Sequence, residues 1–127
     1  MIKKYLSIDW GEKRIGLAIS YLTLAEPLKT LPNDAIIVKK IKFICQEYNV
    51  NTILVGLSEN KSKTKTLLFI KILKKNISLP IITTDETLTT QEAKIKLLSA
   101  KKKKRNGKID HYESCLILQN YLDSHQD

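Results

Sequence analysis

The sequence is poor in the residues that build disulfide frameworks and zinc sites. It contains two cysteines and two histidines among 127 residues. Cys45 and Cys115 lie far apart, each within an apolar helical pattern, and neither belongs to a Cys-x-x-Cys pair. We therefore expect buried, reduced thiols, and we expect neither a disulfide nor a zinc site.

Long hydrophobic runs are also missing. No segment reaches the roughly 20 apolar residues that a membrane-spanning helix needs. The first residues, Met1 to Lys4, lead directly into a predicted strand and lack the apolar run of a signal peptide. We therefore expect no membrane segment and a cytoplasmic location by default. At this length, one domain over residues 1–127 is the expectation.

Acidic residues are scarce relative to basic ones. The chain has 22 lysines and arginines against 13 aspartates and glutamates, which gives a net charge of +9. The excess is concentrated in a basic loop at residues 101–108, which contains six basic residues and no acid. Such a strip suits a polyanionic partner such as nucleic acid. A solvated lysine-rich loop explains the charge equally well.

The apolar pattern predicts the order of the secondary structure. Alternating or continuous apolar runs predict strands at residues 6–9, 15–20, 27–31, 52–57 and 79–84. Helical spacing predicts helices that begin after a cap at Asn33 or Asp34, and at residues 63–75, 89–100 and 109–122. The first helix would bury Ile37, Ile41, Ile44, Cys45 and Tyr48, and the second Leu67, Ile70 and Leu73. Gly11 would supply backbone freedom to the first turn.

This order predicts an α/β fold with one mixed sheet of five strands and helices on both faces. The first strand would lie centrally, beside the strand at residues 52–57. Such an adjacency is a topological switch point, where a crevice opens at the carboxyl ends of the strands.

Three acids fall where the chain should change direction at that edge. Asp9 follows the first strand, Glu86 follows the last, and Asp110 opens the final helix, on one helical face with Ile117 and Tyr121. Carboxylates are costly to bury, and clustered oxygen ligands suit Mg²⁺ or Mn²⁺. One or two such ions could activate water for attack on a phosphodiester. Taken singly, each acid also fits a simpler structural role in a turn, a strand end or a helix start.

The segments that carry these acids resemble the YqgF/RuvX family, described as Holliday junction resolvases or as pre-16S rRNA processing nucleases. The first motif, Asp-x-Gly-x-x-Arg-Ile-Gly-x-Ala, is matched at residues 9–18. Further matches are Ala-x-Pro-Leu at residues 25–28, Val-Gly-Leu at residues 55–57 and Asp-Glu-x-Leu-Thr-Thr at residues 85–90. The last is an Asp at 110 followed by Ile-Leu and Tyr-Leu. The resemblance spans almost the whole chain.

The resemblance implies an RNase H-like fold and assigns roles to single residues. Asp9, Glu86 and Asp110 match the family's metal ligands, and Lys13 and Arg14 match a basic pair that would contact phosphate. The basic loop would add contacts to phosphate without base specificity, through Lys102, Lys103 and Arg105.

The chain departs from the family pattern at three places. Ser58 replaces the Pro after Val-Gly-Leu, Thr87 replaces an Arg after Asp-Glu, and Glu113 begins the segment that replaces a small Ala-Ala pair. Glu113 would be either a solvated side chain or a fourth carboxylate of the site. His111, beside Asp110, is expected on the surface, because the next helix position lies on a different face.

The leading hypothesis is therefore a nuclease that uses Mg²⁺ or Mn²⁺ and matures precursor 16S rRNA at its 5′ end, on ribosomal precursor particles, as a monomer or weak dimer. A resolvase that cuts branched DNA is the second hypothesis, and it would require a dimer. A non-catalytic RNA-binding assembly factor is the third. A nucleotide-binding fold of the actin type would need two large domains, so we reject it.

Overall fold

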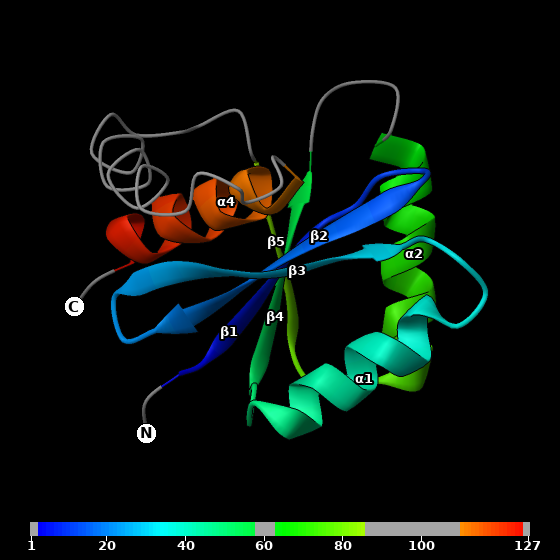
Figure 1. Ribbon diagram of the computed structural model, residues 1–127, viewed down its shortest axis with the longest axis horizontal. Coiled ribbons are helices and arrows are strands. Elements are labelled where there is room, and N and C mark those ends of the chain that lie inside the picture. Colours follow the sequence, from blue (N-terminus) through cyan, green and yellow to red (C-terminus); the bar gives the residue numbers. More distant parts are fainter. Residues whose placement is uncertain (1–2, 58–62, 86–109, 126–127) are drawn as a thin grey trace.

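The computed structural model describes residues 3–57, 63–85 and 110–125 (Figure 1). The predicted helix at residues 89–100 and the basic loop at residues 101–108 lie outside these ranges. The described elements, in chain order, are β1 (Tyr5–Asp9), β2 (Arg14–Tyr21), β3 (Leu24–Pro32), α1 (Ile37–Glu47), β4 (Thr52–Leu57), α2 (Lys63–Asn76), β5 (Ile81–Asp85) and α4 (Asp110–Ser124).

The strands form one mixed sheet of five strands in the order β3-β2-β1-β4-β5. β1 pairs antiparallel with β2 and parallel with β4, so it is the central strand. β2 pairs antiparallel with β3, and β4 pairs parallel with β5. The predicted strand count, the mixed pairing and the central position of β1 are confirmed.

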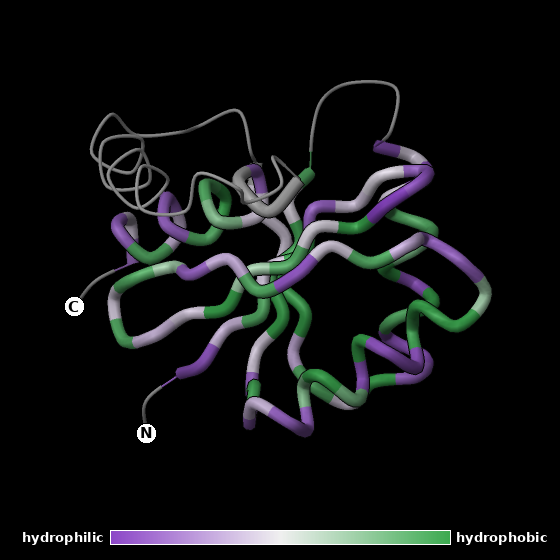
Figure 2. Tube along the Cα trace, in the orientation of Figure 1, coloured by the Kyte–Doolittle hydropathy of each residue, from purple (hydrophilic) through white to green (hydrophobic). Residues whose placement is uncertain are grey.

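Helices cover both faces of the sheet, as predicted (Figure 1). On one face, Leu6 and Ile8 of β1 belong to a core that also contains the buried apolar side chains of α1 and α2. On the other face, Tyr5 of β1 and Leu54 of β4 pack with the apolar side of α4. Figure 2 shows the hydrophobic residues along the inner strands and the inward sides of the helices. The apolar run of β4 is therefore buried from both sides.

The predicted apolar stripes are mostly confirmed, with one error. Ile37, Ile41, Ile44 and Cys45 of α1 are buried, and Tyr48 packs against the same core. In α2, Ile70 and Leu73 are buried, but Leu67 is 44% exposed and Phe69 is buried in its place. Phe69 was not predicted, although it lies beside Leu73 on the same side of the helix, and its burial rotates the apolar stripe away from Leu67.

The predicted side-chain cap of α1 is wrong. The helix begins at Ile37 with Ile36 as its N-terminal flanking residue, and no side chain caps it. The Asp34 carboxylate instead accepts a hydrogen bond from the backbone N–H of Ile36, at 3.1 Å. The Asn33 side chain turns away and donates to the carbonyl oxygen of Gly11 at 2.7 Å. Asn33 therefore stabilises a distant turn rather than the helix that follows it.

Cys45 and Cys115 are both buried, as predicted, and neither forms a disulfide. In the part of the chain that is described, none of the helices is both long enough and apolar enough to cross a membrane.

Candidate active site at the carboxyl edge of the sheet

Asp9 is the last residue of β1 and is half-buried on the face of the sheet that α4 covers. Side chains alternate along a strand, so Tyr5, Ser7 and Asp9 share one face. Tyr5 packs in the core beneath α4, and Ser7 is hydrogen-bonded to α4, which identifies that face. Asp9 is the first position on this face of β1 that is not buried.

Helix α4 runs antiparallel to β1, so its first residue lies beside Asp9. The Tyr5 ring meets the Tyr121 ring edge-on, with 5.3 Å between centroids, and the Ser7 hydroxyl donates to the Ser114 carbonyl at 2.9 Å. From Ser7 to Asp9 the strand extends roughly 6.6 Å. From Ser114 back to Asp110 the helix extends roughly 6 Å in the same direction. The start of α4 at Asp110 is therefore level with Asp9. The structure describes the backbone of Asp110 but not its side chain.

The strands on either side of β1 place a glycine next to Asp9. Asp9 pairs with Gly16 of β2, and Gly56 follows the residue of β4 that pairs with Ile8. Gly56 in turn pairs with Thr84 of β5. The carboxylate of Asp9 is therefore flanked on both neighbouring strands by residues without a side chain. The sequence contained the signal, as two glycines within the motifs, but only the register places both beside Asp9.

Strand β5 ends at Asp85, directly before Glu86 in the sequence. Glu86 itself lies outside the described residues, as do Lys102, Lys103, Arg105, Ser58 and Thr87. The structure thus brings two of the three predicted acids to one edge at the level of the backbone. The third is the next residue after a strand that ends at the same edge.

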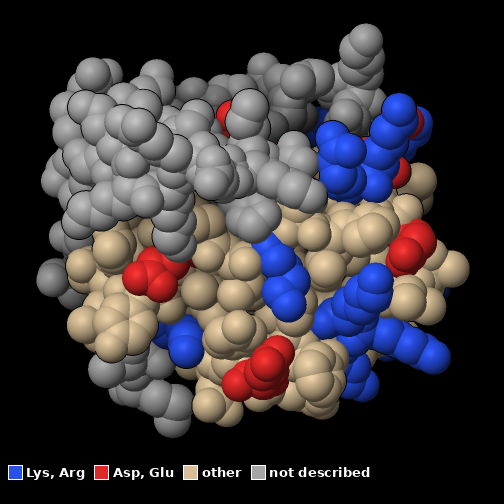
Figure 3. Space-filling view, viewed as in Figure 1, with Lys and Arg blue, Asp and Glu red and all other residues tan. Residues whose placement is uncertain are grey.

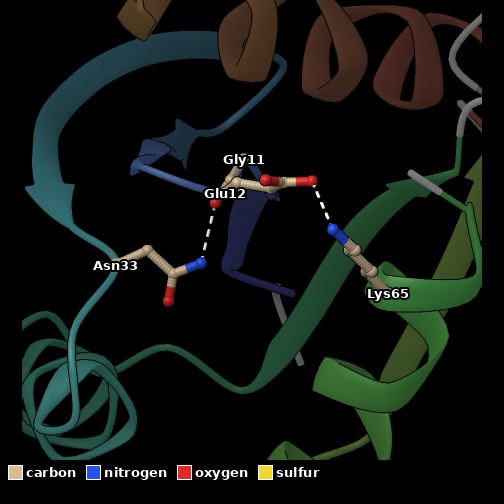
Figure 4. A network of polar contacts seen from close by, with 4 residues as sticks. All are labelled: Gly11, Glu12, Asn33 and Lys65. Atoms are coloured by element: carbon tan, nitrogen blue, oxygen red, sulfur yellow. Dashed lines mark hydrogen bonds and ion pairs between the residues drawn. The ribbon is translucent and has the colours of Figure 1, made fainter. Parts of the chain in front are cut away.

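The turn that follows Asp9 is held by contacts from two distant segments (Figure 4). Asn33 binds it twice, since its side chain donates to the Gly11 carbonyl and its backbone N–H donates to the Lys13 carbonyl at 3.0 Å. Glu12 forms an ion pair with Lys65 near the start of α2. The hydrogen bond and the positive charge of Lys65 lower the pKa of the Glu12 carboxyl. The two hydrogen bonds from Asn33 hold the turn against the segment before α1, and the exposed Glu12–Lys65 pair adds a weak contact with α2.

Gly11 is needed for space rather than for a left-handed conformation. No described glycine has a positive φ, so the predicted role in backbone freedom is wrong. A Cβ atom at Gly11 would instead lie 2.6 Å from the Arg14 carbonyl oxygen, which is closer than real Cβ atoms approach other atoms. The tight turn between β1 and β2 therefore has no room for a side chain at this position unless the backbone shifts.

The predicted basic pair lies at the same corner of the molecule. Lys13 and Arg14 are both exposed, and Arg14 begins β2. By alternation, Arg14 shares the face of Gly16 and therefore that of Asp9. Figure 3 shows lysine and arginine side chains over the β1–β2 turn and also over β3 and α1. An anionic backbone that reached Asp9 across this corner would meet positive charge first.

The donor set at this edge fits a hard divalent cation better than zinc. The described side chains alone contain no group of three potential metal ligands. Among them, Cys45 and Cys115 are buried in the two cores, and the His125 ring stacks on Tyr121 near the far end of α4. What remains at the edge is the half-buried Asp9, which is flanked by the glycines of β2 and β4 and lies level with Asp110, the first residue of α4. Glu113 is exposed, in agreement with a solvated side chain.

The sequence is similar to that of known proteins along most of its length. Residues 3–124 match the RuvX family, described as Holliday junction resolvase. A relative from Thermoanaerobacter pseudethanolicus, named "Putative pre-16S rRNA nuclease", is 39% identical over 98% of this chain and 99% of its own. A relative of the same name from Clostridium acetobutylicum is 37% identical over 95% of this chain and 98% of its own.

Solved structures show the same fold at low sequence identity. RuvC from Thermus thermophilus, solved in complex with a Holliday junction substrate, superposes with a TM-score of 0.69 at 9% identity, over 97% of this chain and 95% of that one. The fowlpox virus resolvase, solved with Holliday junction DNA, gives a TM-score of 0.56 at 16% identity, over 98% of this chain and 99% of that one. These likenesses confirm the RNase H-like fold.

Proposed function

Because this chain belongs to the RuvX family, we propose that it is a divalent-metal-dependent nuclease that processes the 5′ end of precursor 16S rRNA. The observation that carries the proposal is the position of Asp9. It ends the central strand, lies between two glycines, and is level with the first residue of α4, Asp110. Its relatives' shared name supplies the substrate class.

In this proposal Asp9, Glu86 and Asp110 hold Mg²⁺ or Mn²⁺. When bound, the metal supplies a Lewis acid that activates water and stabilises the leaving oxygen of a phosphodiester. β1 fixes Asp9 through pairing on both sides, and the glycines Gly16 and Gly56 leave room for a substrate backbone next to it.

The cationic side chains have a separate task, which is to hold the substrate. Lys13 and Arg14 orient the phosphodiester from the neighbouring turn, and Lys102, Lys103 and Arg105 add contacts to phosphate. Contacts of this kind position a nucleic acid without reading its bases. Specificity for the rRNA precursor would then come from its shape and from the ribosomal precursor particle in the cytoplasm, with the protein acting as a monomer or weak dimer.

Cleavage of branched DNA is the second candidate, because the family description names a Holliday junction resolvase. Resolution requires two symmetric cuts and therefore two active sites related by a two-fold axis. The oligomeric state of the protein on its substrate separates this candidate from the first.

The test compares the protein with its Asp9→Asn variant on labelled precursor rRNA and on a four-way DNA junction, each with Mn²⁺ and with EDTA. Asp34→Asn is the matched control, since it makes the same chemical change at an exposed loop. Metal-dependent cutting of the RNA that is lost only in Asp9→Asn supports the proposal. Symmetric cutting of the junction alone supports the resolvase instead.

Two outcomes contradict the proposal, the first at its metal site and the second at its catalytic activity. If Asp9→Asn cleaves like the unmodified protein, Asp9 is not a metal ligand of the reaction. If the folded protein binds RNA in a salt-dependent way and cleaves nothing with any divalent ion, it is a non-catalytic assembly factor.

A further inference from the structure

An open groove of about 350 Å³ lies between α1 and the edge strand β3, outside the candidate active site. Its volume is at the lower end of the range for sites that hold small organic groups. The residues that line it include Lys29, Ile36, Lys39, Lys40, Phe43 and Glu47.

The groove exposes apolar side chains that the core does not need. Phe43 is 64% exposed and Ile36 is 49% exposed, whereas the inward face of α1 is already filled by its buried isoleucines. Ile36, Lys40, Phe43 and Glu47 are spaced by four, three and four residues, so they form one stripe along the helix. An aromatic ring that remains in solvent on an ordered helix is available to an external partner.

The charges around Phe43 indicate an anionic partner. Lys29 on β3 and Lys39 and Lys40 on α1 line the groove, against a single acid, Glu47. In Figure 3, basic side chains also lie over β3 and α1 in the same view as those over the β1–β2 turn. An aromatic platform surrounded by cations is the arrangement by which proteins hold single-stranded nucleic acid, through base stacking and contacts to phosphate.

The groove is connected to the candidate active site through the segment between β3 and α1. Asn33 in this segment makes both hydrogen bonds to the turn that carries Lys13. The groove itself lies on the α1 face of the sheet, because Lys29 pairs with the core residue Leu17, whereas Arg14 lies on the α4 face. A chain that passed from Lys13 to the groove would have to turn around the end of β3, so the segment bound there would be a flexible single strand.

We infer that the groove between α1 and β3 binds a single-stranded segment of nucleic acid, with Phe43 stacking on a base and Lys29, Lys39 and Lys40 contacting phosphates. This inference rests on the proposed function in one respect, since the bound segment is taken to belong to the substrate. It adds a binding site that is separate from the metal ligands.

The experiment measures binding of a fluorescently labelled single-stranded RNA oligonucleotide by anisotropy, without metal, in the Asp9→Asn background. Phe43→Ala is expected to weaken binding by roughly 5- to 100-fold, and Phe43→Tyr to retain it, because both aromatic rings stack. The double variant Lys39→Ala/Lys40→Ala is expected to reduce the magnitude of the slope of log affinity against log salt by about 1.4, since each phosphate contact to a single strand contributes about 0.7.

Matched controls come from the exposed face of α2. Leu68 is 55% exposed there, so Leu68→Ala removes a comparable apolar side chain. Lys71→Ala/Lys75→Ala removes two exposed charges on the same helix. The inference predicts that the control variants bind RNA nearly as well as the parent protein, apart from a weak general effect of charge.

The inference is overturned if folded Phe43→Ala binds RNA like the parent, or if the Leu68 control loses as much affinity. It is also overturned if poly-glutamate, and not RNA, binds in a Phe43-dependent way, which would indicate an acidic protein partner. Failure of the nuclease proposal is seen separately, as absent cleavage by the unmodified protein. Binding that depends on Phe43 would still stand in that case.

Discussion

Substitution of Gly11 tests how closely the turn after β1 controls the candidate active site. A Cβ atom in Gly11→Ala would lie 2.6 Å from the Arg14 carbonyl, and ordinary contact begins at 3.4 Å, so the backbone must shift by about 0.8 Å. Overpacking of this kind costs about 1–3 kcal/mol of stability. The shift falls between Asp9 and Arg14, and displacements near 1 Å reduce catalytic rates by up to about 100-fold. We expect a 10- to 100-fold slower cleavage rate.

The assay pairs the cleavage rate with the free energy of unfolding from denaturant titration. Gln119→Ala is the control for stability. Gln119 is fully buried, and its side-chain oxygen accepts a hydrogen bond from the buried backbone N–H of Ala25 at 2.9 Å. Ala25 lies at the end of the β2–β3 hairpin that is farthest from Gly11. Leaving that N–H unpaired costs about 1–3 kcal/mol, similar to the cost at Gly11. We expect Gln119→Ala to keep the cleavage rate. Equal rates for Gly11→Ala and the unmodified protein, or equal losses in both variants, would refute the reasoning.

Two further predictions concern stability alone. Burial raises the pKa of the Cys45 thiol from 9.0 to about 11. Below pH 9.0 the thiol is neutral in both the folded and the unfolded protein, and the stability is at its full value. As the pH rises from 9.0 towards 11, the thiol ionises more readily in the unfolded protein, and the free energy of unfolding falls. The loss is about 2–3 kcal/mol by that pH and should be absent from Cys45→Ala in parallel denaturant titrations. Leu22 is 65% exposed with a φ of 58°, a strained conformation that asparagine tolerates, so Leu22→Asn should raise the unfolding free energy by about 0.5–1 kcal/mol. A lower midpoint of denaturation for Leu22→Asn would contradict that account.

The fold was largely predictable because its signals are periodic and local. Alternation marked β1 and β2, and the continuous apolar run of β4 indicated a strand covered on both faces, which the two cores confirm. The order of elements then left few topologies, since crossovers between parallel strands are right-handed. Periodicity averages over many residues, so a single error such as Leu67 does not change the result.

Side chains that act over long sequence distances were not predictable in the same way. Asn33 is a good helix cap by residue type, yet its side chain binds Gly11, 22 residues earlier. The side-chain amide of Asn33 can bond to a nearby or a distant backbone group equally well, and only the packed structure determines which group lies within reach. The same holds for Lys65 and Glu12, whose ion pair joins α2 to the first turn.

The candidate site lies between these two cases. A carboxylate at a strand end could be predicted for Asp9 from the pattern alone, and so could an acid at the start of α4. Their proximity depends on how α4 lies on the sheet, which is set by contacts distributed along β1, such as the hydrogen bond from Ser7 to the Ser114 carbonyl.

Ser7 and Ser114 are both fully buried, and small side chains at these positions let the helix approach the strand closely enough for the hydroxyl to reach the carbonyl. A larger residue at either position would move α4 away from β1 and separate the start of the helix from Asp9. The serines thus determine the geometry of the proposed metal site without being ligands themselves. A sequence motif made of the acids alone therefore predicts the chemistry of the site, but it omits the residues that set the distance between α4 and β1.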